Sequence, residues 1–289
     1  MHKGIITYIR DSFKILLNNK ALLYTGLIDA VFFMGLIYTT YRLNQITQST
    51  RQVPFYVTGS PPPYFTATVI AGFIGAFILA GKLYMIRKVY EGHHNLSKGK
   101  EPSGVGMEEY GTGLGRFGLK ILVGRVVILI ATFTIVFLLV FQLLESEIPI
   151  LAASAPIVFF LILLLITLWE IIMVAEDGKI VDSISHSISF VKKNYIVVLA
   201  LQIFSGFIAF NSVLHPGVPL VLAERMRANQ LGGNVERTLV ELPAIYQGII
   251  NNLGTYSWIL IFGLIVVLNV IAPMVLMDLY MDRRKVYEK

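Results

Sequence analysis

The sequence predicts an all-α integral membrane protein with six transmembrane helices, built as three repeated units with both termini in the cytoplasm. Of the 289 residues, 55% are hydrophobic and only 15% are charged, whereas a soluble protein of this length has about a quarter charged residues. The apolar residues gather into runs of about 20, the length that an α-helix needs to cross about 30 Å of hydrocarbon. A short motif also recurs at the ends of these runs.

Six runs have the length of a membrane span. They lie at about residues 21–41, 64–86, 120–143, 156–175, 195–214 and 256–280. The first run continues into Thr39-Thr40-Tyr41-Arg42 without a small-residue cleavage site, so we expect it to be retained as a span and not removed as a signal peptide.

Lysine and arginine residues predict the orientation of these spans. They gather in the N-terminal arm, in the segments after spans two and four, and in the C-terminal tail, whereas the segment between spans three and four has none. Basic segments stay on the cytoplasmic side, so the expected location is the plasma membrane with both termini inside. The net charge of +6 is then mainly a topology signal, with attraction to anionic lipids at the cytoplasmic face. Its division among four short segments argues against nucleic acid as a partner.

The pentapeptide Arg-Lys-Val-Tyr-Glu occurs at 87–91 and again at 284–288, each time where an apolar run ends. Leu-Tyr-Met precedes both copies, and a weaker echo lies at 168–176. Repetition of this kind indicates a duplicated structural unit. We interpret the pentapeptide as the cytoplasmic end of a repeated hairpin, in which the basic pair anchors the span and Tyr90 and Tyr287 lie at the level of the lipid head groups.

The beginnings of the repeated units are amphipathic. Apolar residues recur with helical spacing at 5–16 and 180–191, and both stripes end in a similar stop containing Asn19 or Asn194. The stretch ahead of span three is interrupted by four glycines between 111 and 118 and is interpreted as a flexible approach to the span. We expect interfacial helices at these places, each followed by a two-span hairpin.

These patterns predict one polytopic membrane domain over residues 1–289. Its three repeat units are expected at about 1–92, 107–178 and 179–289. The outside loop at about 215–255 is partly apolar, and we interpret it as a cap on the helix bundle, with a surface for a partner as the alternative.

Ionisable residues inside the predicted spans are the candidate functional residues. They are Asp29, Lys82, Arg125, Glu170 and Asp278. Lys82, Arg125 and Glu170 lie about six residues inside the cytoplasmic ends of their spans, which places them about 9 Å deep. Charges are costly at this depth and mark functional candidates by default. We interpret this charged layer as an ion-pair network that fixes helix packing, with the polar lining of a substrate or proton path as the alternative.

Other motifs predict little chemistry. Pro273, with Asn269 one turn earlier, is expected to bend the sixth span. His93 and His94 lie on a loop with Gly and Lys and are interpreted as solvated side chains and not as metal ligands. Cysteine is absent, and so are the common hydrolase and phosphate-loop signatures. We therefore assign no catalytic, cofactor-binding or metal-binding residue and expect a non-enzymatic protein without cofactors.

One stretch resembles a known family. Val-Ala-Glu-Asp-Gly at 174–178 is followed by Ser183 and Ser187 on an amphipathic helix and by Val-Lys-Lys-Asn at 191–194, just before a new span. This pattern resembles the six-span membrane domain of some glycerophosphoryl diester phosphodiesterases and related uncharacterised bacterial and archaeal membrane proteins. The resemblance implies a prokaryotic protein with this architecture. It does not carry over the phosphodiesterase activity, which in that family belongs to a separate soluble barrel.

The favoured function is therefore a non-enzymatic membrane protein that organises or assists a membrane-protein partner or complex, with a homo-oligomer as one form of it. The alternative is a transporter or channel for small molecules or ions that uses the charged layer. A membrane-embedded lipid enzyme is a third hypothesis, for which the sequence offers neither a nucleophile nor a metal set.

Overall fold

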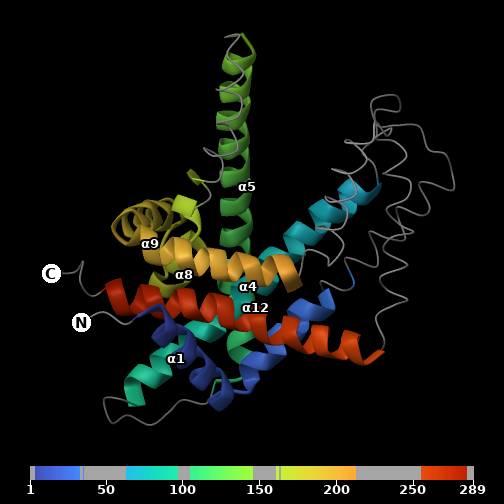
Figure 1. Cartoon of the computed structure of the whole chain (residues 1–289), viewed down its shortest axis with the longest axis vertical. Helices are drawn as coiled ribbons and strands as arrows, with labels where there is room; N and C mark the ends of the chain where they lie inside the picture. The colour runs from blue at the N-terminus through green and yellow to red at the C-terminus, as the bar shows by residue number, and fades with distance from the viewer. Residues whose placement is uncertain are drawn as a thin grey trace, which may run out of the picture. The chain divides into compact units, whose positions relative to one another are not determined.

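The computed structural model describes residues 4–32, 35, 63–96, 105–145, 161–162, 164–212 and 255–284, and the regular secondary structure of these residues is helical throughout. The helices are α1 (Ile5–Asn18), α4 (Pro63–Leu96), α5 (Met107–Glu145), α8 (Trp169–Glu176), α9 (Ile180–Ser212) and α12 (Thr255–Arg284), shown in Figure 1. A further helix, Ala21–Phe32, follows α1. The predicted all-α class is confirmed for this part of the chain. The loop predicted at 215–255 lies outside the described residues.

One of the described helices has the length and apolar composition of a membrane span. The segment Ile70–His93 of α4 is long and apolar enough to cross a bilayer. A second candidate exists if α1 and Ala21–Phe32, which are bent by 100° relative to each other, are counted as one broken span. The arrangement with six spans stays a prediction.

Two compact units divide the chain. The first consists of Met1–Thr25, Phe73–Ile203 and Ile271–Lys289, and the second of Gly26–Gly72 and Phe204–Val270. The first unit contains α1, α5 and α8 together with the parts of α4, α9 and α12 that carry the sequence motifs. The candidate site is therefore described within this unit.

The two predicted stops of the amphipathic helices share one local geometry. Asn19 follows the end of α1 with φ −126° and ψ 69°, and Asn194 interrupts α9 with φ −126° and ψ 23°. Asn19 Nδ2 donates to the carbonyl of Ile15 at 2.8 Å, and Asn194 Nδ2 donates to the carbonyl of Phe190 at 3.0 Å. Each asparagine thus satisfies a carbonyl four residues earlier that its own backbone leaves open. Both predicted helix stops are confirmed.

The glycine-containing stretch before the third predicted span is helical, so its interpretation as a flexible approach is wrong. It belongs to α5, a single helix of 39 residues. Gly113 lies against α4, because a Cβ atom there would be 2.6 Å from Tyr84 Cβ and 2.9 Å from the Ala80 carbonyl oxygen. At Gly81 of α4 a Cβ atom would be 2.9 Å from the Tyr110 carbonyl oxygen. These glycines allow two helix backbones to approach closely, as small residues do in membrane proteins.

Two predicted helix boundaries differ from the structure. The helix that carries the first pentapeptide does not end with it, because α4 continues to Leu96. The apolar run at 156–175 is not one helix in its described part, because a turn at Thr167 and Leu168 separates residues 164–166 from α8. The interruption at Leu168 has a specific partner, Ser187, which is described below.

Candidate functional site

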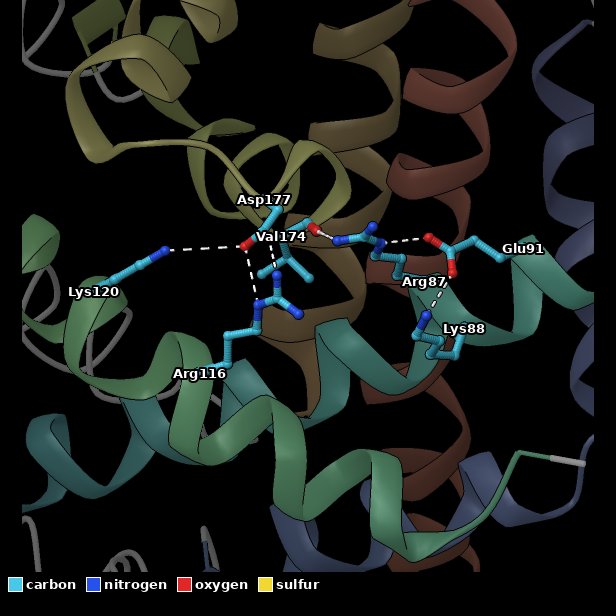
Figure 2. A network of polar contacts seen from close by, with 7 residues as sticks. All are labelled: Arg87, Lys88, Glu91, Arg116, Lys120, Val174 and Asp177. Carbon is cyan, nitrogen blue, oxygen red and sulfur yellow. Dashed lines mark hydrogen bonds and ion pairs between the residues drawn. The ribbon is translucent and has the colours of Figure 1, made fainter. Parts of the chain in front are cut away.

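The first pentapeptide lies at the centre of a network of polar contacts in the first unit. We call this network the polar junction. It joins α4 to α1, α5, the end of α8 and α12 through Ser12, Arg87, Lys88, Tyr90, Glu91, Arg116, Lys120, Val174, Asp177 and Met274. Figure 2 shows the part of the junction between α4, α5 and α8.

Arg87 connects α4 to the C-terminal end of α8. Its Nη1 donates to the carbonyl oxygen of Val174 at 2.7 Å, and its Nε donates to Glu91 Oε1 at 2.6 Å. Lys88 Nζ donates to the other carboxylate oxygen of Glu91 at 2.8 Å. The Val174 carbonyl is one of the last four of α8, which have no partner within the helix and carry its negative dipole end. A guanidinium group is therefore well matched to this position.

Asp177 ends α8 and connects it to α5. Its backbone is left-handed, with φ 55° and ψ 37°, and Gly178 N–H donates to the Met173 carbonyl at 3.0 Å, which closes the helix end. Asp177 accepts hydrogen bonds from Arg116, including one from Nε at 3.1 Å, and Lys120 Nζ lies 4.0 Å from Oδ1. These bonds to Asp177 raise the pKa of Arg116. An aspartate tolerates the left-handed backbone better than most residues, and here its carboxylate also pairs with α5.

Tyr90 connects α4 to α1 and α12. Its hydroxyl donates to the Met274 carbonyl at 3.1 Å and lies 3.2 Å from Ser12 Oγ. The side chain is only 8% exposed, so Tyr90 is held inside the first unit, and its place at the level of the lipid head groups stays a prediction. A buried hydroxyl needs such partners, because it has no water to bond with. Tyr287, its counterpart in the second copy, lies outside the described residues.

The C-terminal end of α12 is tied to both amphipathic helices. Tyr8 of α1 donates its hydroxyl hydrogen to Asp282 Oδ2 at 2.8 Å, and Arg283 Nε donates to the Tyr8 hydroxyl oxygen at 3.4 Å. Arg283 Nη1 donates to Asn194 Oδ1 in α9 at 2.6 Å. Burial is the main reason why the pKa of Tyr8 is raised to about 12, while Arg283 lowers this pKa and Asp282 raises it.

Tyr8 is expected to make stability depend on pH in the alkaline range. A pKa raised from 10.0 to about 12 means that the neutral phenol is the form stabilised by folding. This contribution is complete below about pH 10 and is lost as the pH rises towards 12. We expect the stability difference between the wild type and Tyr8→Phe to shrink over this window in thermal unfolding measured in detergent from pH 8 to 12. A difference that stays constant with pH would contradict the assignment.

Ser187 occupies the interruption ahead of α8. Its hydroxyl donates to the Leu165 carbonyl at 2.9 Å and accepts the Leu168 N–H at 3.3 Å. Ser187 is fully buried, so it supplies partners that the broken helix no longer provides. Beyond the break, Ile172 N–H donates to the Leu168 carbonyl at 2.9 Å, and α8 resumes.

Replacing Ser187 with alanine is expected to destabilise the protein by about 1 to 2 kcal/mol, because the buried Leu168 N–H and the partly buried Leu165 carbonyl lose their partner. Ser189→Ala is the matched control, since Ser189 is an exposed serine two residues further along the same helix. Ser189→Ala is expected to lower the free energy of unfolding by less than about 0.5 kcal/mol. Unfolding in detergent with increasing urea measures both variants. Equal losses in the two would show that the Ser187 hydroxyl does not support the broken helix.

The five charged candidates are found in different surroundings. Arg125 Nε donates to Glu170 Oε1 at 2.6 Å, and the two side chains are 39% and 18% exposed. Lys82 and Asp278 are each 7% exposed within the same unit. Asp29 is half-buried and belongs to the second unit. Arg125 and Glu170 are thus paired with each other, and the role of the charged layer stays a prediction.

Pro273 lies inside α12, and the helix runs through it from Thr255 to Arg284. The bend predicted there, with Asn269 four residues earlier, stays a prediction. Pro273 is half-buried, and the neighbouring Met274 supplies the carbonyl that Tyr90 binds.

In the described part of the chain, no three histidine, aspartate or glutamate side chains are grouped so that they could hold a metal ion. Glu91, the acidic residue two positions before His93, is bonded to Arg87 and Lys88. The side chain of His94 lies outside the described set.

Sequence reasoning missed a second polar cluster in the first unit. Glu176 accepts a hydrogen bond from the Tyr280 hydroxyl, and its Oε2 lies 2.9 Å from His186 Nδ1. Phe190 packs against the Tyr280 ring with their centroids 5.2 Å apart. The signals in the sequence were Tyr280, in the Leu-Tyr-Met that precedes the second pentapeptide, and Glu176, in the Val-Ala-Glu-Asp-Gly stretch.

The regular secondary structure of the described residues is helical, and several of their charged groups are paired near helix ends. Comparison with models of protein families, with curated proteins and with solved structures finds no match for this chain. The resemblance to the membrane domain of glycerophosphoryl diester phosphodiesterases therefore remains an expectation from the sequence.

Proposed function

We propose that this protein is a non-enzymatic polytopic membrane protein, with six spans in three repeated units, that organises or assists a partner in the plasma membrane. One observation carries the proposal, namely the apolar side chains that α5 exposes. They are Leu119, Val123, Val126, Val127, Leu129, Ile130, Ile135 and Leu138. So many exposed apolar side chains on one helix call for lipid or for another protein to cover them.

The ends of the helices support the same proposal. The 100° bend between α1 and Ala21–Phe32 fits an interfacial helix followed by a span. The polar junction joins helices on the side that is basic in sequence, where the positive-inside rule places the cytoplasm. Its charged groups bond to one another and to helix ends, which favours a structural role over a reactive one.

The membrane location can be tested with single cysteines, because the chain has none of its own. Lys192→Cys is expected to react with a membrane-impermeant maleimide only after the cells are opened, since Lys192 is exposed and belongs to a predicted cytoplasmic segment. Glu147→Cys, in the predicted outside loop after span three, is expected to react in intact cells. Release of the protein from membranes by alkaline carbonate, or labelling of Lys192→Cys in intact cells, would contradict the proposal.

The partner can be tested with a photo-crosslinking amino acid on α5. At the exposed Leu129 it is expected to give a defined adduct in cells, whereas at the fully buried Ile121 of the same helix it is expected to give none. Adducts with lipid alone under every condition would leave the apolar surface as a simple lipid contact and would count against the assisting function.

A transporter or channel is the second candidate, and the burial of Lys82 and Asp278 favours it, because buried charges in a span can line a path. Substitutions of the Arg125–Glu170 pair distinguish a structural role of these charges from a role in transport. If the pair is structural, Glu170→Gln is expected to lower the yield of folded protein, since it leaves Arg125 without its counterion, and the double variant with Arg125→Gln is expected to recover part of the yield. Flux in liposomes that is lost in the folded double variant would favour the transporter instead.

A further inference from the structure

A cleft of about 360 Å³ opens in the first unit between α8, α9 and α12. Its lining includes Glu176 from the end of α8, His186, Ser189 and Lys193 from α9, and Arg284 from α12. Phe190 and Tyr280, whose rings pack against each other in a tilted arrangement, complete it with an aromatic wall. The cleft is not part of the polar junction and has no role in the proposed function.

The charges of the cleft favour an anion. Lys193 and Arg284 are both cationic, and they come from different helices. Glu176 is the acidic residue of the lining, and both of its carboxylate oxygens are engaged, one by the Tyr280 hydroxyl and the other by His186 Nδ1. The lining therefore keeps a net positive charge, and its carboxylate is already held by neighbouring groups.

The size and chemistry of the lining narrow the class of ligand. A volume of about 360 Å³ is at the small end of the range of ligand pockets, which is about 300 to 1,000 Å³. It suits a single small polar group. The lining offers guanidinium, ammonium and hydroxyl donors from two helices, and several donors of this kind suit the oxygens of a phosphate. The aromatic wall suits the apolar part of an esterified phosphate.

The positions of Lys193 and Arg284 in the chain also favour a phosphate ligand. Lys193 stands at the end of the amphipathic helix of α9, directly before the interruption at Asn194, and Arg284 is the last residue of α12. Both mark the ends of predicted spans on the basic side, which is the depth of the phosphate layer in a bilayer.

We infer that the cleft lined by His186, Ser189, Lys193 and Arg284 is a binding site for a phosphate group, supplied either by a phospholipid head group or by a soluble phosphate. The lipid source rests on the proposed membrane location, whereas the soluble source does not. Lys193 and Arg284 hold the phosphate oxygens, Ser189 donates a hydroxyl hydrogen, and His186 is fixed by Glu176 at the edge of the cleft.

The test uses the full chain purified in a neutral detergent and follows its thermal unfolding with increasing amounts of each probe, because a ligand of the folded state raises the midpoint. The probes are inorganic phosphate at constant ionic strength, phosphatidylglycerol, and two controls without phosphate, acetate and diacylglycerol. We expect phosphate or phosphatidylglycerol to raise the midpoint in a saturable manner and the two controls to leave it unchanged.

Two double variants with equal loss of charge identify the site. Lys193→Gln with Arg284→Gln is expected to weaken binding about 30-fold, at about 1 kcal/mol for each basic residue near a lipid phosphate. Lys192→Gln with Lys14→Gln removes two exposed basic residues outside the cleft, and its effect is expected to stay below about threefold. If the first double variant fails to fold, Lys193→Gln alone, at an exposed position, is expected to weaken binding about fivefold.

Each outcome bears on the inference. Binding of inorganic phosphate that is lost in the cleft variant supports a soluble ligand, and binding of phosphatidylglycerol alone supports a lipid head group. Absence of binding by both, equal losses in the two double variants, or equal binding of acetate or diacylglycerol would overturn the inference. Failure of the carbonate and labelling tests would overturn the proposed membrane function but would leave the phosphate result in detergent untouched.

Discussion

Gly113→Val is expected to lower the free energy of unfolding by about 3 kcal/mol, the upper part of the range for overpacked interiors. A Cβ atom at this position would lie 2.6 Å from Tyr84 Cβ, 2.9 Å from the Ala80 carbonyl oxygen and 3.0 Å from Gly81 Cα. Two of these three atoms belong to the backbone of α4, so no change of side-chain rotamer can make room. The valine therefore forces α4 and α5 apart along their contact.

The control is Gly111→Val, in the same turn region of α5. No atom lies within 4 Å of a Cβ at Gly111, while the change in helix propensity from glycine to valine is the same at both positions. We expect Gly111→Val to be neutral or slightly stabilising in unfolding measured in detergent with urea. Similar losses in the two variants would show that glycine at 113 serves the helix itself and not the approach of α4.

Two other glycines of α5 also lie close to neighbouring helices, but there the nearest atoms belong to side-chain rings and not to backbone. A Cβ at Gly118 would lie 2.2 Å from an atom of the Phe77 ring, and one at Gly124 would lie 2.3 Å from an atom of the Trp169 ring. An isolated helix with this many glycines is weak, because glycine costs about 1 kcal/mol relative to alanine at each interior position. Packing against α4 and α8 offsets that cost, which explains why local propensity misled the sequence interpretation here.

Local signals predicted the helix stops correctly. Asn19 and Asn194 each follow an amphipathic stripe, and each bonds the carbonyl four residues earlier. Such a bond depends only on residues within one helical turn, so a pattern in the sequence is enough to locate it. The all-α class follows in the same way from long apolar runs that require internally bonded backbone.

Contacts between distant segments could not be predicted in this way. The pair of Arg116 with Asp177 joins residues 61 positions apart, and the bond from Arg87 to Val174 joins residues 87 positions apart. Asp-Gly after an apolar helix does predict a C-terminal cap, but nothing local indicates which helix the aspartate pairs with. The Arg125–Glu170 pair was anticipated only because both charges were placed at one depth of the membrane.

Arg87→Gln is expected to lower the free energy of unfolding by about 2 to 3 kcal/mol. The substitution removes two charge-assisted hydrogen bonds, each in the range of about 1.5 to 3 kcal/mol before partial compensation by the new amide. It also leaves the Val174 carbonyl, at the C-terminal end of α8, without its guanidinium donor. Glu91 keeps Lys88 as a partner, so the main loss falls on the connection between α4 and α8.

Lys88→Gln is the matched control, because it removes one positive charge from the next residue and one bond to the same carboxylate. Lys88 is 36% exposed, against 19% for Arg87, and an exposed ion pair contributes at most about 1 kcal/mol. In thermal unfolding in detergent, we expect Arg87→Gln to have a midpoint well below that of Lys88→Gln. The midpoint of Arg87→Lys is expected to lie between the two, since lysine keeps the charge but loses the planar pair of donors. Equal losses for the two glutamine variants would mean that the basic pair acts only as membrane-anchoring charge. A larger loss for Arg87→Gln would mean that Arg87 is a structural link between helices. Arg283 has such a role at the end of α12, where it binds both Asn194 and Tyr8.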